Sequence, residues 1–280
     1  MSTADLHQFC AENQEDVETL AESFSDYQPF KGMGVPHIMK WLGQFKSQHW
    51  PLALGLAKTI QYYSSACIDN QLRALGKAML QHIKREAVPF SSVFYVPAGG
   101  PGESGQDIAR RYRNINSLRP RKNQFVDIVT LPERLFKCKK PMVVFLDDFI
   151  GTGEQICNFW SAVVSQLVPE YLPMYLGVVV AYNEGLERVE DESPIKVIPV
   201  HTLDSQHQLL HATDSQFDKN QKRILKGYCE KWGNHPLGYH DMAALVSFFH
   251  GTPNNAPSVV RGSKRQRPYR GLLPGWDDLA

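Results

Sequence analysis

The stretch that decides the fold is Val143-Val144-Phe145-Leu146-Asp147-Asp148-Phe149-Ile150-Gly151-Thr152-Gly153. Its four apolar residues are typical of a strand that helices cover on both sides. Open α/β sheets bind their ligands at the carboxyl ends of their strands, so the two acids that follow are expected at a binding edge. The glycines beside Thr152 permit a tight turn into a helix, whose first backbone N–H groups attract phosphate.

Short β-rich runs alternate with helical stretches on both sides of this segment. From Ser92 onward, strands are expected at residues 93–96, 125–129, 142–146, 176–182 and 197–200. This alternation predicts an α/β fold with a mostly parallel sheet, helices on both faces and right-handed crossovers.

Apolar residues recur every three or four positions before residue 88, which predicts a helical N-terminal region over residues 1–88. The α/β domain is expected over 89–250, and an irregular basic C-terminal tail over 251–280. An amphipathic helix beyond Asp214 should end near Gly233, and a further helix is expected from Asp241 to Phe249. The basic residues of the tail are Arg261, Lys264, Arg265, Arg267 and Arg270.

Composition excludes several classes of protein. The chain of 280 residues is 42% hydrophobic with a net charge of +1, so it can bury a core and has no global attraction to nucleic acid. Its apolar runs are shorter than the ~18 to 20 residues of a membrane span. An acidic N-terminus without Lys or Arg before Lys31 is unlike a signal peptide. Five scattered cysteines fit buried thiols in a reducing cytoplasm.

A second glycine-rich loop follows the expected strand at 93–96. It contains Gly99, Gly100, Ser104 and Gly105 and leads into a helix expected over Asp107–Arg113. Its glycines permit close backbone approach, and Ser104 can donate to a phosphate or cap the helix. The cationic side chains that follow, Arg110, Arg111 and Arg113, could neutralise a pyrophosphate or form a solvated helix face.

The run of apolar residues, two acids, Phe149, Thr152 and Gly153 resembles the signature of type I phosphoribosyltransferases. The resemblance implies that Asp147 and Asp148 are the catalytic acids, which contact the ribose hydroxyls of phosphoribosyl pyrophosphate and hold Mg²⁺ indirectly. It assigns phosphate and ribose binding to Phe149, Ile150, Gly151, Thr152 and Gly153. It assigns the pyrophosphate to the loop of Gly99, Gly100, Ser104 and Gly105, with Arg110, Arg111 and Arg113 as neutralising groups.

The sequence departs from that signature directly after Gly153, where Glu154 and Gln155 replace a small residue and a hydroxyl residue. An acid in the first turn stabilises an empty helix by roughly 0.3 to 1 kcal/mol but repels a bound phosphate unless it points away. Three hypotheses therefore stay open. The first is a Mg²⁺-assisted transferase, and the second is a non-catalytic sensor or nucleic-acid-binding regulator of the same fold. The third is a Mg²⁺ hydrolase that uses the same acids on a nucleotide.

Three further motifs narrow the resemblance. Trp41-Leu42-Gly43-Gln44-Phe45, Ser104-Gly105 and Thr252-Pro253-Asn254-Asn255 are similar to segments of the phosphoribosyltransferase-like proteins of bacterial conflict and defence systems. That resemblance implies a cytoplasmic nucleotide-processing effector in anti-phage defence, with a partner protein or nucleic acid. It also implies that the helical region, with Asn254 and Asn255, holds the acceptor.

Overall fold

The computed structural model describes residues 3–100, 103–211, 216–262 and 269–275. The chain forms two compact units. The first, here the helical unit, comprises Met1–Ser65 and Ser205–Ala280, and the second, here the sheet unit, comprises Ala66–Asp204. These bounds differ from the expected ranges of 1–88, 89–250 and 251–280, because the C-terminal part of the chain shares a core with the N-terminal helices.

The sheet unit contains four parallel strands in the order β2-β3-β4-β5. Their bounds are β2 (Val93–Pro97), β3 (Met142–Ile150), β4 (Met174–Tyr182) and β5 (Lys196–Leu203). Val93 pairs with Met142, and Val143 pairs with Met174. The predicted parallel sheet is therefore confirmed. β3 is longer than expected, since it continues through Asp147 and Asp148 to Ile150.

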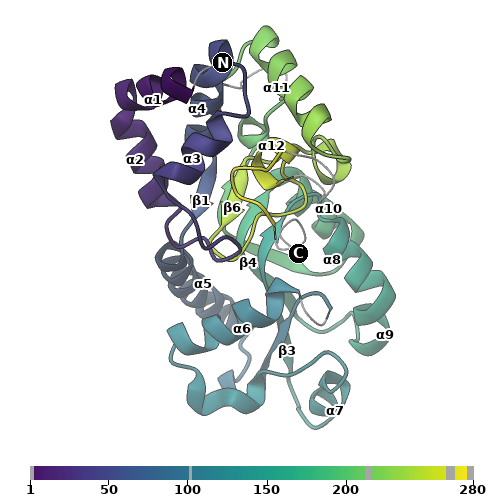
Figure 1. Cartoon of the computed structure of the whole chain (residues 1–280). Coiled ribbons are helices and arrows are strands. Elements are labelled where there is room, and N and C mark those ends of the chain that lie inside the picture. The colour runs from purple at the N-terminus through teal and green to yellow at the C-terminus, as the bar shows by residue number, and fades with distance from the viewer. Residues whose placement is uncertain (1–2, 101–102, 212–215, 263–268, 276–280) are drawn as a thin grey trace. The chain divides into compact units, whose positions relative to one another are not determined.

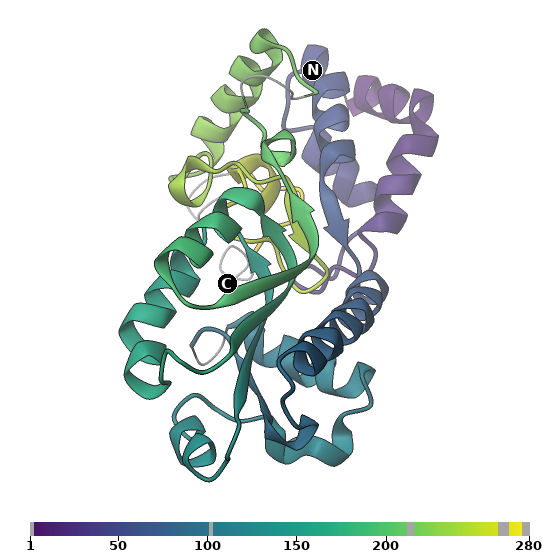
Figure 2. The ribbon, with the colours of Figure 1, turned by 180° about the vertical axis from the view of Figure 1, so that it is seen from behind.

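Helices cover both faces of this sheet (Figures 1 and 2). On one face lie α5 (Ser65–Arg85) and α6 (Ser104–Ile115). A β-carbon on Gly177 would lie 3.1 Å from Leu75 of α5, and the Tyr95 ring lies 5.5 Å from that of Tyr112 in α6. The core of the opposite face contains residues of α7 (Leu131–Phe136), α8 (Glu154–Phe159), the π-helical turn Trp160–Val164 and α10 (Asn183–Glu192), and the short α9 (Ser165–Leu167) continues that turn.

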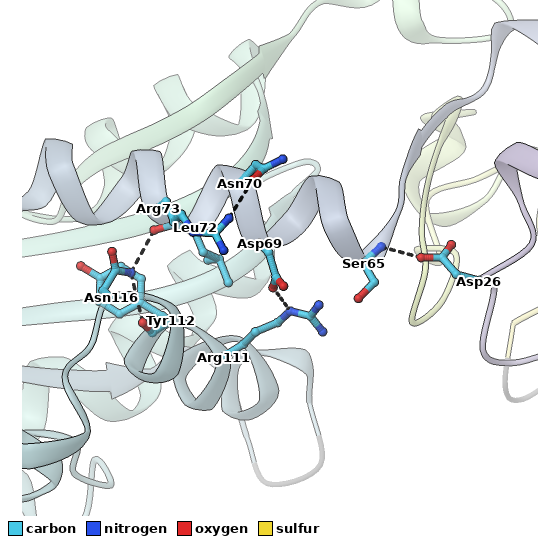
Figure 3. A network of polar contacts seen from close by, with 9 residues as sticks. All are labelled: Asp26, Ser65, Asp69, Asn70, Leu72, Arg73, Arg111, Tyr112 and Asn116. Carbon is cyan, nitrogen blue, oxygen red and sulfur yellow. Dashed lines mark hydrogen bonds and ion pairs between the residues drawn. The ribbon is translucent and has the colours of Figure 1, made fainter.

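Polar contacts connect α5 with α6 (Figure 3). Arg111 Nε lies 2.5 Å from Asp69 Oδ1, and both side chains are about three-quarters buried. Near the end of α6, Asn116 Nδ2 donates to the carbonyl oxygens of Leu72 at 3.0 Å and Tyr112 at 3.1 Å. These contacts keep α6 beside the long helix, and the start of α6 carries part of the candidate site.

The helical unit combines both ends of the chain. Its α-helices are α1 (Thr3–Glu12), α2 (Gln14–Ser23), α3 (Val35–Leu42), α4 (Trp50–Thr59), α11 (Lys219–Trp232) and α12 (Ser258–Arg261). Strands β1 (Gln61–Tyr63) and β6 (Val246–Phe248) pair in parallel. Trp41 Nε1 donates to Val259 O at 2.9 Å, and the Phe45 ring packs on Trp232. Gly233 ends α11 as predicted.

Several expected elements differ from those observed. The first 88 residues are not all helical, because β1 pairs with the distant β6. The expected strand at 125–129 is reduced to one bridge between Phe125 and Tyr95, since a turn at Asp127 to Thr130 follows at once. The helix expected over Asp241–Phe249 is absent. Left-handed φ angles at His240, Asp241 and Ala243 are incompatible with a helix, and β6 lies there instead.

The described 3₁₀ turns are η1 (Ser47–His49), η2 (Phe90–Ser92), η3 (Arg119–Gln124), η5 (Ser205–His207) and η6 (Tyr239–Asp241). Of the basic tail, Arg261 Nε donates to Thr252 O, whereas Lys264, Arg265 and Arg267 lie outside the described residues. Among the helices of the described ranges, none has the length and apolar composition needed to cross a membrane.

Gly76, in the middle of α5, tests the contact between α5 and α6. A β-carbon there would lie 2.0 Å from Asn116 Oδ1, so Ala must displace the side chain that donates to Leu72 and Tyr112. We expect Gly76→Ala to reduce the free energy of unfolding by about 1 to 3 kcal/mol in urea titrations. Gly227→Ala in α11, where nothing lies within 4 Å, should instead stabilise by roughly 0.4 to 1 kcal/mol. Equal stabilisation by both variants would contradict the packing described.

Candidate functional site

The difference in length between β2 and β3 creates the candidate site. Pairing of β2 with β3 ends at Pro97 and Leu146, with Ala98 N donating to Leu146 O at 2.9 Å. β3 continues to Ile150, paired there with β4 alone. The loop that follows β2 therefore lies beside the last residues of β3, and both acids stand at that edge of the sheet.

Asp147 and Asp148 are buried, with exposed fractions of 4% and 6%. Ser104 is the first residue of α6, and its hydroxyl donates to Asp148 Oδ1 at 2.6 Å. Ser104 Oγ also lies 3.4 Å from Asp147 Oδ1. The backbone N–H of Asp148 also donates to Asp147 Oδ1 at 3.0 Å. Two segments predicted separately from the sequence, the acid pair and the Ser104 loop, are therefore joined by direct hydrogen bonds.

Close backbone approach brings Ser104 within reach of the acids. A β-carbon on Gly105 would lie 2.2 Å from Ala98 O, so only glycine lets the first turn of α6 lie against the end of β2. At Gly105 the absent side chain makes room for the chain's own backbone. Binding of a pyrophosphate by this loop stays a prediction.

Burial strongly raises the pKa of Asp147, and the neighbouring Asp148 carboxylate raises it further. The backbone N–H of Asp148 lowers it, with a smaller effect. Burial beside Asp148 therefore disfavours the ionised form of Asp147, and a bound cation would favour that form.

The loop of Gly151, Thr152 and Gly153 packs against the start of α10. Gly153 has a φ of +76°, and a β-carbon on it would lie 2.6 Å from Gly185 O. A β-carbon on Gly185 would in turn lie 2.1 Å from Gly151 O. Gly151 and Gly153 are buried and Thr152 is half-buried. Sequence inspection missed Gly185, because its role depends on packing between two segments that are distant in sequence.

Glu154 and Gln155, the two residues that differ from the family signature, contact different segments of the sheet unit. Glu154 Oε2 lies 3.9 Å from Arg188 Nη1 of α10. Gln155 Nε2 instead donates to Glu103 Oε2 at 2.5 Å, which links the loop after β3 to the loop after β2. Glu103 was not singled out from the sequence, although its place between a glycine loop and Ser104 was a usable signal.

The remaining predicted side chains have partners within the sheet unit. Arg110 pairs with Asp107 at 2.9 Å on the exposed surface of α6, and Arg111 pairs with Asp69 of α5. The Arg113 guanidinium lies 5.7 Å from the centre of the Phe125 ring. The Phe149 ring packs edge-on against Tyr182, 6.1 Å between centres. Ile150 is buried.

A buried acid pair and a glycine loop at the carboxyl edge of a parallel sheet are the features of a ligand-binding α/β protein. The family model PRTase-CE matches residues 38–275, and the chain belongs to that family. Among solved structures, that of orotate phosphoribosyltransferase from Aeropyrum pernix is similar at 20% identity and a TM-score of 0.31, covering 49% of this chain and 70% of that chain. A comparison with curated protein sequences found no significant match.

The raised pKa of Asp147 predicts how stability changes with pH. A carboxyl whose folded pKa lies above its ordinary value of 3.8 loses stabilising free energy as the pH rises from that value through the folded pKa. Asp147→Asn stays neutral throughout, so its melting temperature should exceed that of the wild type by a margin that grows from pH 4 upward. Asp191→Asn, at an exposed site on α10, is the matched control and should show no such trend. A margin that shrinks with rising pH would contradict a raised pKa for the folded-state Asp147.

Proposed function

We propose that this chain binds a ligand that carries ribose 5-phosphate and pyrophosphate groups, together with Mg²⁺, and acts as a Mg²⁺-assisted phosphoribosyltransferase or a related nucleotide-processing effector. The observation that carries the proposal is the buried Asp147–Asp148 pair, held by Ser104 at the carboxyl end of β3 and followed by the glycine loop. Carboxylate oxygens there can accept hydrogen bonds from ribose hydroxyls. The loop of Gly151 to Gly153 is proposed to receive the 5′-phosphate.

The carboxyl oxygens of Asp147 and Asp148 are suited to a Mg²⁺ ion that is also coordinated by the phosphate groups of the ligand. In the parts of the chain that the structure describes, no group of three His, Cys, Asp or Glu side chains is arranged to bind a metal ion. Mg²⁺ commonly binds through one or two carboxylates, waters and substrate phosphates, so the Asp pair would be sufficient. Bound there, the cation would neutralise charge on a pyrophosphate group and on Asp147.

The second candidate is a sensor or nucleic-acid-binding regulator that keeps the fold without transfer chemistry. The contact between Gln155 and Glu103 favours it, because the position expected to offer a hydroxyl to phosphate instead bonds a carboxylate. We also propose, for either candidate, that the protein acts in anti-phage defence together with a partner protein. Untargeted metabolite profiling of cells that express the wild type and the double variant Asp147→Asn/Asp148→Asn would identify an acceptor if transfer occurs.

Isothermal titration calorimetry with phosphoribosyl pyrophosphate and MgCl₂ tests the proposed site. We expect the wild type to bind and Asp147→Asn and Asp148→Asn to bind at least about tenfold more weakly, since each removes a charged acceptor worth roughly 1.5 to 3 kcal/mol. Asp191→Asn should bind as the wild type does. The proposal fails if the wild type gives no heat, or if the Asp147 and Asp148 variants bind equally well.

Release of pyrophosphate separates the two candidates. A transferase should release it when supplied with its acceptor, whereas the sensor should bind ligand and release none. A nucleic-acid regulator should bind RNA in a salt-dependent manner, and Arg110→Gln should weaken that binding, because Arg110 is the exposed arginine of α6.

A further inference from the structure

The Glu103 side chain lies on the glycines of the loop after β2. A β-carbon on Gly99, which has a φ of +85°, would lie 2.0 Å from Glu103 Oε2. A β-carbon on Gly100 would lie 3.8 Å from Oε1. The two carboxylate oxygens of Glu103 therefore lie where side chains would be if residues 99 and 100 were not glycines. The absence of a side chain at Gly99 lets an anionic group approach the backbone closely, and in this structure that group is the Glu103 carboxylate.

A second segment holds Glu103 in that place. Gln155, at the start of α8, donates Nε2 to Glu103 Oε2 at 2.5 Å, and Nε2 lies 3.4 Å from the position of a Gly99 β-carbon. Gln155 and Glu103 are both exposed to solvent, so the contact can open without disturbing the core. The hydrogen bond between Glu103 and Gln155 therefore joins the loop after β2 to the loop after β3.

The charge of Glu103 also reaches the buried acids. Burial is the main cause of the raised pKa of Asp147, followed by Asp148, and the Glu103 carboxylate adds a smaller contribution of the same sign. A pyrophosphate group on this loop would meet the Glu103 carboxylate on the glycines, in addition to the buried pair of Asp147 and Asp148. The repulsion would weaken anion binding until Glu103 moves or a cation compensates.

We propose that Glu103 determines the specificity of the loop by acting as an internal anion, which competes with the pyrophosphate group of a ligand for Gly99 and Gly100 and is held there by Gln155. The inference rests on the proposed function for the identity of the ligand, although the competition itself concerns any pyrophosphate. Ligands that bring a divalent cation are favoured over free anions, and Glu103 swings away from the glycines when they bind.

Calorimetric titration of the full chain with inorganic pyrophosphate in MgCl₂ tests the competition. Glu103→Ala removes the competing anion and should tighten binding by about tenfold, the equivalent of one hydrogen bond to a charged group. Glu103→Gln keeps the shape and removes the charge, so it should tighten binding by a smaller factor. Gln155→Ala keeps the charge and removes its restraint, and should also tighten binding.

Glu170→Ala is the matched control, because it removes an exposed carboxylate from a turn before β4 and should leave binding unchanged. Equal or weaker pyrophosphate binding by Glu103→Ala, with an unchanged melting temperature, would overturn the inference, since Glu103 would then be neutral or a ligand contact. Should the wild type fail to bind phosphoribosyl pyrophosphate while Glu103→Ala gains affinity for pyrophosphate, the proposed function fails and the competition stands. If the wild type binds phosphoribosyl pyrophosphate and Glu103→Ala shows no gain, only the competition fails.

Discussion

Two adjacent carboxyl groups buried at the end of β3 set the main physical constraint on the sheet unit. Removing like charges from water is unfavourable unless hydrogen bonds or a cation compensate. Ser104 and the Asp148 amide supply part of that compensation, and Ser104 reaches the pair because Gly105 lets α6 lie against Ala98. The hydrogen bond from Ser104 to Asp148 therefore helps to position α6, the helix that packs against α5.

Glycines at close contacts connect the loops around this pair. Gly153 and Gly185 allow the loop after β3 to pack closely against the start of α10. Glu154 lies near Arg188 on the same helix. Gln155 turns the opposite way, toward Glu103 and Gly99. The arrangement is acidic where an anionic ligand is proposed to bind, so a cation is the natural partner of that ligand.

The helical unit explains two motifs that the sequence made conspicuous. Trp41, Leu42 and Phe45 are buried in its core, and Thr252 Oγ1 donates to Leu273 O while contacting Tyr27 and Ser247. Asn255 is buried, and its amide lies 3.4 Å from Tyr239 O, whereas Asn254 is exposed. These contacts account for most of both motifs by packing within the unit, and the acceptor role of Asn254 and Asn255 stays a prediction.

The sequence by itself determined the parallel sheet and the place of Asp147 and Asp148, because continuous apolar runs and a glycine turn are local signals. The strand expected at 125–129 and the helix expected at 241–249 failed where a turn and left-handed residues overrode local preference. Only the tertiary structure showed that Ser104 bonds the acid pair, that Gly185 seats the loop, and that Glu103 meets Gln155. Each of these contacts joins segments that are distant along the chain, so no periodicity or spacing within one segment can reveal them.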